Sequence, residues 1–185
     1  MLVKIKLPIN IEINNFFTNK PYFIRDLADD SLYERLIPLI VKVCNEPRIF
    51  NRLFAKKFVK GATYRPINAL EFLVYANRGW QKQEKFQFAI FNEDNDIVGT
   101  LELRSNDSKA CEIGYWASEN HRGIMSNAVI AIAKLAKSVG YEKLFLLIAP
   151  DNIASQKVAK NAGFLLENPH FENSKGVYQL YEKKL

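Results

Sequence analysis

The sequence predicts an α/β (α+β) fold in which one mixed, mostly antiparallel sheet carries helices on both of its faces. Three observations predict it. Two segments of alternating hydrophobicity meet across a polar turn at 92–96, an amphipathic helical pattern at 124–139 connects two strand segments, and a short helix with two strand segments closes the chain. A chain of 185 residues without repeats or linkers fits one domain, which we place at 1–185.

The N-terminal part of the chain is predicted to be mainly helical. Residues 1–20 form short apolar segments broken by Pro8, for which we expect an edge strand or an extended arm. The polar cluster at 29–31 is typical of a helix start, and the helix that follows contains Pro38, where we expect a kink or a break. Asn68 is then expected to cap a second helix.

The C-terminal part is predicted to alternate strands with helices. Gly140 follows the amphipathic helix at the position where left-handed backbone commonly ends a helix, and Asn152 is expected to cap the short helix that follows. The run at 144–149 is apolar throughout, which is typical of a strand buried on both faces. The predicted strands are 22–25, 86–90, 97–103, 111–116, 144–149, 164–166 and 177–181.

The composition is that of a soluble globular protein, with 48% hydrophobic and 25% charged residues. The apolar runs are too short to span a bilayer, and the N-terminal segment has no apolar stretch of the kind found in signal peptides. We therefore expect a cytoplasmic protein that does not bind membranes. The formal net charge of +6 favours anionic partners, although a solvated basic surface explains it equally well.

Cysteine and histidine usage argues against several classes of site. Cys44 and Cys111 lie far apart and without metal-ligand spacing, so we expect neither a disulfide framework nor a zinc site. With only His121 and His170 available, we expect no metal. His170 is expected in an exposed loop. The sequence also contains no G-x-S-x-G motif, so nothing indicates a catalytic triad.

The segment from 113 to 126 carries the strongest functional pattern. A strand ends, a short polar loop follows, and Gly123 stands where the amphipathic helix begins. Amides at a helix start have no intrahelical partners and, together with the helix dipole, can hold a pyrophosphate. Gly123 would let the backbone approach the phosphate oxygens, and Arg122 would add positive charge. The structural alternative is an ordinary strand-to-helix turn in which Gly123 only relieves steric strain.

Two motifs together resemble the GNAT superfamily of N-acetyltransferases, in particular its RimJ/RimL branch. The first is the strand at 112–116 with the run Arg122-Gly123-Ile124-Met125-Ser126-Asn127-Ala128. The second is Asn152-Ile153-Ala154-Ser155 followed by Asn161-Ala162-Gly163-Phe164. The resemblance covers roughly residues 22–185. It implies an acetyl-CoA-dependent transfer to a primary amine, with the pantetheine of acetyl-CoA lying between two splayed central parallel strands.

The resemblance also implies which residues contact acetyl-CoA. Backbone groups of the strand would pair with the pantetheine, the loop and helix start would hold the pyrophosphate, and Asn152 would bridge to the cofactor or cap its helix. No metal is implied. The predicted contacts are Tyr115, Trp116, Ala117, Asn120, His121, Arg122, Gly123, Ile124, Met125, Ser126 and Asn152.

Two proton transfers remain for side chains, because an ammonium must lose a proton and the departing thiolate must gain one. We expect Glu112 to be the base, acting directly or through water, although a surface glutamate in a cross-strand pair is equally consistent. Glu167 and Glu172 are fallback bases. Ser155 resembles the serine of the family's N-x-x-S motif and is the expected acid, with a helix-start cap as its structural alternative.

The loop departs from the family pattern Q/R-x-x-G-x-G/A. Asn120 stands at its first position and Met125 at its last, and His121 stands where RimL-like members often carry glycine. Three functions therefore remain open: acetylation of a protein N-terminus, acetylation of a small amine such as a polyamine, amino sugar or antibiotic, and a catalytically weak acyl-CoA-binding module. We expect a monomer or homodimer that does not bind nucleic acid directly.

We expect the acceptor to be recognised by the N-terminal half, residues 29–82. Its connector at 45–66 would repel a polycationic amine if it faced the acceptor cleft, and would be only a solvated surface if it did not. Tyr75 and Trp80 either line that cleft or belong to the core. The cationic residues of the connector are Arg48, Arg52, Lys56, Lys57, Lys60 and Arg65.

Overall fold

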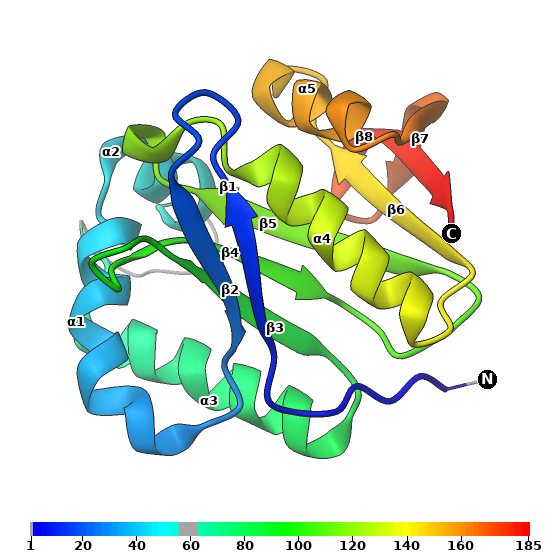
Figure 1. Ribbon diagram of the computed structural model, residues 1–185. Coiled ribbons are helices and arrows are strands. Elements are labelled where there is room, and N and C mark those ends of the chain that lie inside the picture. The colour runs from blue at the N-terminus through cyan, green and yellow to red at the C-terminus, as the bar shows by residue number, and fades with distance from the viewer. Residues whose placement is uncertain (1, 56–62) are drawn as a thin grey trace.

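A computed structural model describes residues 2–55 and 63–185, and its strands form one eight-stranded sheet (Figure 1). The order across the sheet is β1-β2-β3-β4-β5-β6-β8-β7, and every neighbouring pair is antiparallel except β5 and β6. The mixed, mostly antiparallel sheet is therefore confirmed. The strands are β1 (Asn10–Asn14), β2 (Pro21–Asp26), β3 (Phe86–Phe91), β4 (Ile97–Leu103), β5 (Cys111–Ala117), β6 (Lys143–Ile148), β7 (Leu165–Asn173) and β8 (Gly176–Lys184).

Helices cover both faces of the sheet, as Figure 1 shows. Helices α1 and α3 pack with β3 and β4 around one apolar cluster, whereas α4 and α5 contribute to a second cluster on the opposite face. The predicted placement of helices on both faces is confirmed. The helical elements are η1 (Asp30–Leu32), α1 (Tyr33–Cys44), α2 (Pro47–Ile49), the π-helical turn η2 (Phe50–Phe54), α3 (Pro66–Lys82), η3 (Glu119–His121), α4 (Met125–Ser138) and α5 (Ile153–Asn161).

The N-terminal segment forms an edge strand, in agreement with one of the two predictions for it. β1 pairs with β2, and the segment before it is anchored by the buried side chains of Val3 and Ile5. The amide of Val3 donates to the carbonyl of Asn106, 2.8 Å away, beyond the end of β4. The first residues therefore belong to the folded core.

Of the kink or break expected at Pro38, the break does not occur, and the cap expected at Asn68 is corrected. Helix α1 continues through Pro38, because a proline removes only one backbone hydrogen bond and the apolar face of this helix is buried. Helix α3 begins at Pro66, so Asn68 is its third residue and not its cap. The side chain of Asn68 instead accepts from the amide of Arg65, 3.0 Å away. The donor therefore lies before Asn68 in the chain, whereas a cap would accept from an amide after it.

Two predictions about strands are also corrected. β6 alternates between buried and half-buried residues, because α4 and α5 cover only one of its faces; Phe145 and Leu147 lie on the other face and are half-buried. His170 is exposed, but it lies within β7 and not in a loop, because β7 and β8 continue beyond the predicted closing strands.

The central parallel strands separate soon after they meet. β5 and β6 pair only at Cys111 with Leu144 and at Glu112 with Phe145. Beyond these positions β5 stays paired with β4 as far as Ala117, and β6 stays paired with β8. The splayed central parallel strand pair expected from the family resemblance is therefore present.

Candidate active site

The separation of β5 from β6 leaves backbone groups of β5 without a strand partner. The amide of Arg104 donates to the carbonyl of Glu112, and the amide of Ser118 donates to the carbonyl of Val98. Because hydrogen bonding alternates along an antiparallel strand, the even-numbered residues of β5 face β4. The backbone groups of Tyr115 and Ala117 consequently face the gap toward β6, beyond the last pair of β5 with β6, and they can pair with an extended ligand.

This alternation refines the sequence prediction for the strand. Tyr115 and Ala117 present backbone groups to the gap, as an acyl carrier there would require. The backbone of Trp116 instead faces Thr100 on β4, with which it is paired. The side chain of Trp116 packs against the apolar cluster of α1 and α3, so its contribution to the gap is structural.

The start of α4 lies where the sequence places a phosphate-binding loop. Helix α4 begins at Met125 with Ile124 before it, and the side chains of both residues are buried. Only their amides are available to a ligand, since the first amides of a helix have no intrahelical partner. The hydroxyl of Ser126 lies 3.3 Å from the side-chain amide of Asn161, which ties this helix start to the end of α5.

The loop before α4 is short and partly exposed. Asn120 and Arg122 are exposed, and the amide of Asn120 donates to the hydroxyl of Ser118, 3.2 Å away. The ring of His121 does not point outward: its Nδ1 lies 2.9 Å from the hydroxyl of Tyr22. Burial lowers the pKa of His121, so at neutral pH this ring adds no positive charge for a phosphate.

Gly123 has a backbone conformation that requires glycine. Its φ is +94°, and a Cβ there would lie 2.6 Å from the ring of Phe17 and 2.8 Å from Oδ1 of Asn15. Close packing by the β1–β2 hairpin is thus one reason for a glycine at this position. The motif alone explains this glycine by phosphate approach or by relief in a turn, and it contains no sign of the hairpin.

Asn152, Ser155 and Tyr115 come together where α5 begins. The side-chain oxygen of Asn152 accepts from the amide of Ser155 at 3.3 Å, which is the expected N-cap contact, and its amide group donates to the Ser155 hydroxyl at 2.8 Å. The Tyr115 hydroxyl lies 3.3 Å from the carbonyl oxygen of Ser155, and burial raises the pKa of Tyr115 to about 12. Strand β5 and helix α5 therefore meet at Ser155.

Glu112 belongs to a charged cluster that sequence reasoning missed. Arg104 forms ion pairs with Glu112 and with Glu102, and the latter distance is 3.1 Å. Glu102 also accepts from the hydroxyl of Tyr75, 2.7 Å away. A Cβ on Gly114 would lie 2.6 Å from the Arg104 guanidinium, so this glycine lets Arg104 lie flat against β5. Glu112 thus has a cross-strand partner in addition to its predicted role as a base.

A comparison with protein families decides the identity of the fold. The acetyltransferase (GNAT) domain matches residues 32–165. The chain belongs to this family. It is therefore a transferase that uses acetyl-CoA as the acyl donor for an amine. A sequence comparison with curated proteins finds no match.

Three solved acetyltransferase structures are similar to this chain over most of both lengths. A microcin C7 self-immunity acetyltransferase, MccE, with acetyl-CoA and AMP has 22% identity and a TM-score of 0.69, covering 88% of this chain and 92% of its own. RimL, a ribosomal L7/L12 α-N-protein acetyltransferase, with coenzyme A has 22% identity and a TM-score of 0.70, covering 89% and 94%. RimJ of Mycobacterium smegmatis has 14% identity and a TM-score of 0.71, covering 95% and 86%. The resemblance of the fold to RimJ and RimL is thus confirmed.

The cationic connector approaches the mouth of the GNAT gap through two of its arginines. Arg48 lies 3.9 Å from Glu119, in the loop after β5, and Arg52 lies 3.0 Å from Asp151, in the loop after β6. The connector therefore starts across the ends of both splayed strands. Lys56, Lys57 and Lys60 lie outside the described residues.

The remaining candidates are placed away from the gap or in the core. Trp80 is buried in the core, as one of its two predictions required, whereas Tyr75 is exposed beside Glu102. The fallback bases Glu167 and Glu172 are exposed on β7, near the far edge of the sheet. Cys44 and Cys111 are buried free thiols.

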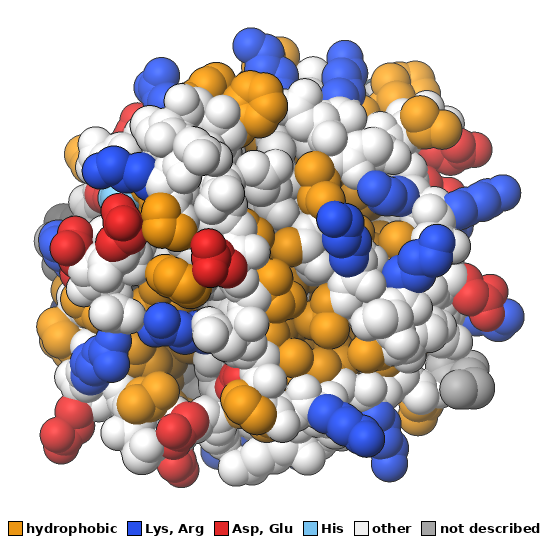
Figure 2. All heavy atoms as spheres, in the orientation of Figure 1, with side chains coloured by type: hydrophobic (Ala, Val, Ile, Leu, Met, Phe, Trp, Pro, Cys, Tyr) orange, Lys and Arg blue, Asp and Glu red, His pale blue; other side chains and the backbone are white. Residues whose placement is uncertain are grey.

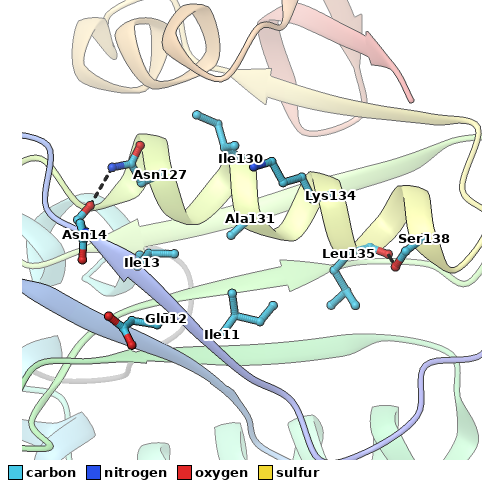
Figure 3. Close-up of a pocket in the computed structure, with 10 residues that line it drawn as sticks. All are labelled: Ile11, Glu12, Ile13, Asn14, Asn127, Ile130, Ala131, Lys134, Leu135 and Ser138. Atoms are coloured by element: carbon cyan, nitrogen blue, oxygen red, sulfur yellow. Dashed lines mark hydrogen bonds between the residues drawn. The ribbon is translucent and has the colours of Figure 1, made fainter.

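Two cavities lie near the site, and neither coincides with the gap between β5 and β6. One of about 520 Å³ lies between β1 and α4, and Figures 2 and 3 show hydrophobic side chains gathered in it. The other, of about 190 Å³, lies between α1 and the loop of Asn120 and His121. Within the described ranges, no cluster of side chains suited to a metal ion occurs, and no helix has the length and hydrophobicity needed to cross a membrane.

Proposed function

We propose that the protein acetylates the N-terminal amine of another protein, that its single domain spans 1–185, and that it works in the cytoplasm. The observation that supports this acceptor most strongly is the position of Arg48 and Arg52 across the ends of β5 and β6. Because Arg48 and Arg52 pair with Glu119 and Asp151, these carboxylates are not left free to attract a polycationic amine, and each guanidinium has further N–H donors for an acidic peptide segment. The fold resemblance to RimL and RimJ agrees with this acceptor.

Acetyl-CoA supplies an activated thioester, and we propose that two parts of the chain hold it. The backbone groups of Tyr115 and Ala117 pair with the pantetheine arm along the open edge of β5. The amides from 122 to 126 hold the pyrophosphate, because they lie at the positive end of the α4 dipole, whereas the amide of His121 already donates to the carbonyl of Ser118 at 3.3 Å. Arg122 is exposed next to these amides and adds charge.

The transfer itself requires one bond to form and one to break. The neutral amine of the acceptor attacks the thioester carbonyl, the new N–C bond forms, and the C–S bond breaks to release coenzyme A as a thiolate. The backbone amide of Tyr115, on the open edge of β5, stabilises the negative charge that develops on the carbonyl oxygen. Two protons must move with the help of side chains, the first from the acceptor ammonium and the second to the thiolate; the attacking nitrogen releases one more proton to solvent as the amide forms.

We assign the second proton transfer to Ser155. Its oxygen accepts a hydrogen bond from the Asn152 side chain, so its own hydrogen is free to point elsewhere. Asn152 thereby orients Ser155 while it caps α5. The serine donates its proton to the departing sulfur and regains one from solvent.

We assign the first proton transfer to Glu112, acting directly or through a water molecule. Glu112 lies at the last position where β5 and β6 are paired, at the vertex of the gap. Its ion pair with Arg104 supports the structural alternative equally, because it engages the carboxylate in a contact between β5 and the end of β4. Glu167 and Glu172 remain as fallback bases.

A thiol-release assay with acetyl-CoA tests the proposed acceptor. Acidic and neutral peptides, polyamines and aminoglycosides are compared at equal concentration. We expect release with peptides and preference for acidic ones. Preference for polyamines or aminoglycosides would favour a small-molecule acetyltransferase, and binding of acetyl-CoA without release for any amine would favour a catalytically weak acyl-CoA-binding module.

A charge-reversal variant tests why the protein selects its acceptor. Arg52→Glu should reduce the preference for acidic peptides and raise that for polyamines, because it removes a cation at the ends of β5 and β6. Arg25→Glu is a matched control, because Arg25 lies on β2, where its side chain contacts Asn10 and Asn95. An equal effect of both variants would show that only net charge matters.

A further inference from the structure

The tip of the β1–β2 hairpin lies directly on the loop that precedes α4. Three kinds of contact join them, and they come from side chains and backbone alike. The amide of Phe16 donates to the carbonyl of Gly123 at 3.0 Å. The ring of Phe17 packs so close to Gly123 that a Cβ on this glycine would lie 2.6 Å from it. The hydroxyl of Tyr22 meets Nδ1 of His121 at 2.9 Å.

Asn15 is the centre of this contact. Its side chain is buried, with 4% of its surface exposed, and both ends of its amide are engaged. Its oxygen accepts from the amides of Phe17 and Thr18, at 2.9 and 3.2 Å, and shapes the hairpin turn. Its nitrogen donates to the carbonyl of Arg122 at 2.8 Å. One side chain therefore ties the hairpin tip to the loop.

A further contact extends the same join into the first turn of α4. The side-chain amide of Asn127 donates to the carbonyl of Asn14 at 2.7 Å, and Figure 3 shows the two residues facing each other where β1 and α4 come closest. The amide of Asn15 donates to the carbonyl of Lys20, so the backbone groups of Asn15 face β2. Because hydrogen bonding alternates along an antiparallel strand, the carbonyl of Asn14 faces away from β2 and is available to Asn127.

The loop needs external support because it has little of its own. Between β5 and α4 it contains only the short turn η3, and no capping side-chain bond stabilises the start of α4. A loop with few internal hydrogen bonds samples many conformations, and ordering it on ligand binding lowers affinity. Contacts that hold its backbone in place beforehand therefore raise affinity for whatever its amides bind.

We propose that Asn15 is a positioning residue for the acetyl-CoA loop. By holding the carbonyl of Arg122, Asn15 fixes the direction in which the amides that follow it, from 123 to 126, point and so preorganises them for the pyrophosphate. Asn15 does not touch the cofactor and takes no part in the acyl transfer. The inference rests on the proposed placement of the pyrophosphate at this helix start.

Asn15→Ser isolates the bond to the loop. Serine keeps an oxygen that can accept from the Phe17 amide and preserve the turn, but it has no second group to reach the Arg122 carbonyl. Asn10→Ser is the matched control, because Asn10 lies close by along the chain on β1 and its side chain accepts a hydrogen bond from Arg25, away from the loop before α4. Tyr22→Phe is a second test that leaves the turn untouched and removes only the hydroxyl that meets His121.

Calorimetric titration compares coenzyme A with pantetheine, which lacks the pyrophosphate. We expect Asn15→Ser to weaken coenzyme A binding about threefold to tenfold, as the loss of one hydrogen bond predicts, with a much smaller effect on pantetheine. Tyr22→Phe should shift binding in the same direction, and Asn10→Ser should match the wild type. A merely structural role would lower the thermal midpoint without changing the ratio of the two dissociation constants.

Two results would overturn different parts of this proposal. If the wild type binds coenzyme A no more tightly than pantetheine, the pyrophosphate placement is wrong. If the wild type prefers coenzyme A and Asn15→Ser keeps the same preference, binding of the nucleotide part of coenzyme A stands and the role of Asn15 is wrong. Equal loss in Asn15→Ser and Asn10→Ser would also overturn it, because the effect would not be specific to the loop.

Discussion

Replacing Gly123 by valine tests the loop most severely, because the structure gives two separate reasons for glycine. The backbone φ of +94° is strained for any residue with a Cβ, and more so for a β-branched one. The Cβ would also meet the Asn15 side chain at 2.8 Å and the Phe17 ring at 2.6 Å. The Phe17 ring is exposed and can move, whereas Asn15 is held on both sides by hydrogen bonds.

The expected magnitude follows from these two terms. Backbone strain of this kind costs about 1–3 kcal/mol, and displacing Asn15 loses a hydrogen bond of about 1 kcal/mol. The loop can escape both costs by moving, because it lies outside the regular helices and strands. We therefore expect the strain to be relieved at the expense of the loop geometry and to appear as coenzyme A affinity that is weaker by about 30-fold to several hundred-fold.

Thermal unfolding with and without coenzyme A measures this loss. Gly140→Val is the matched control, because Gly140 has a similar φ of +98° at the opposite end of α4, but a Cβ there would have no heavy atom within 4 Å. Both variants should unfold at a lower temperature, whereas only Gly123→Val should lose the stabilisation by coenzyme A. Equal stabilisation of the two variants by coenzyme A would refute the reasoning.

Three further predictions concern catalysis and pH. Ser155→Ala should lower kcat by about 10²-fold or more with little change in the dissociation constant of coenzyme A, and wild-type turnover would leave the Ser155 hydroxyl with only its structural contact to the Asn152 side chain. Glu112→Gln should lower kcat more than Glu102→Gln, although each variant removes one of the two ion pairs of Arg104. Equal losses would mean that the cluster is structural. Because burial lowers the pKa of His121 in the folded state, its contribution to stability is present above about pH 6.5 and is lost as the pH falls; the thermal midpoint of the wild type should therefore drop more between about pH 7 and pH 5 than that of His121→Gln.

The sequence predicted the fold well where local patterns agree with tertiary packing. The helix at 124–139 was recognisable because its periodicity matched one buried face, and the strands at 86–90 and 97–103 were recognisable by alternation although both of their faces are buried. The break that was one of two expectations at Pro38 does not occur, because burial of the helix face outweighs one lost hydrogen bond. The sequence prediction failed at Asn68, because the same polar residue can cap a helix from before its start or from within its first turn.

The sequence predicted site residues that belong to continuous motifs, but not contacts between separate segments of the chain. The positions of Gly123 and Ser155 could be inferred because they belong to continuous motifs. Asn15 could not, because it acts on Arg122, which is far away in sequence. Arg104 could not, because its contact with Glu112 depends on how β4 and β5 pair and not on a motif. The only signal for Arg104 was the glycine at 114, which leaves room for a large planar group, but one sequence does not reveal what fills that room.

The most direct test of the central claim is mass spectrometry of acceptor peptides after incubation with acetyl-CoA. The peptides carry a free N-terminal amine, an internal lysine and either an acidic or a basic sequence, and polyamines are included in the same mixture. The proposed function predicts one acetyl group on the N-terminal nitrogen of the acidic peptide, with coenzyme A released in equal amount and little product in Ser155→Ala. Acetylated polyamine with unmodified peptides, or no product despite bound coenzyme A, would contradict it.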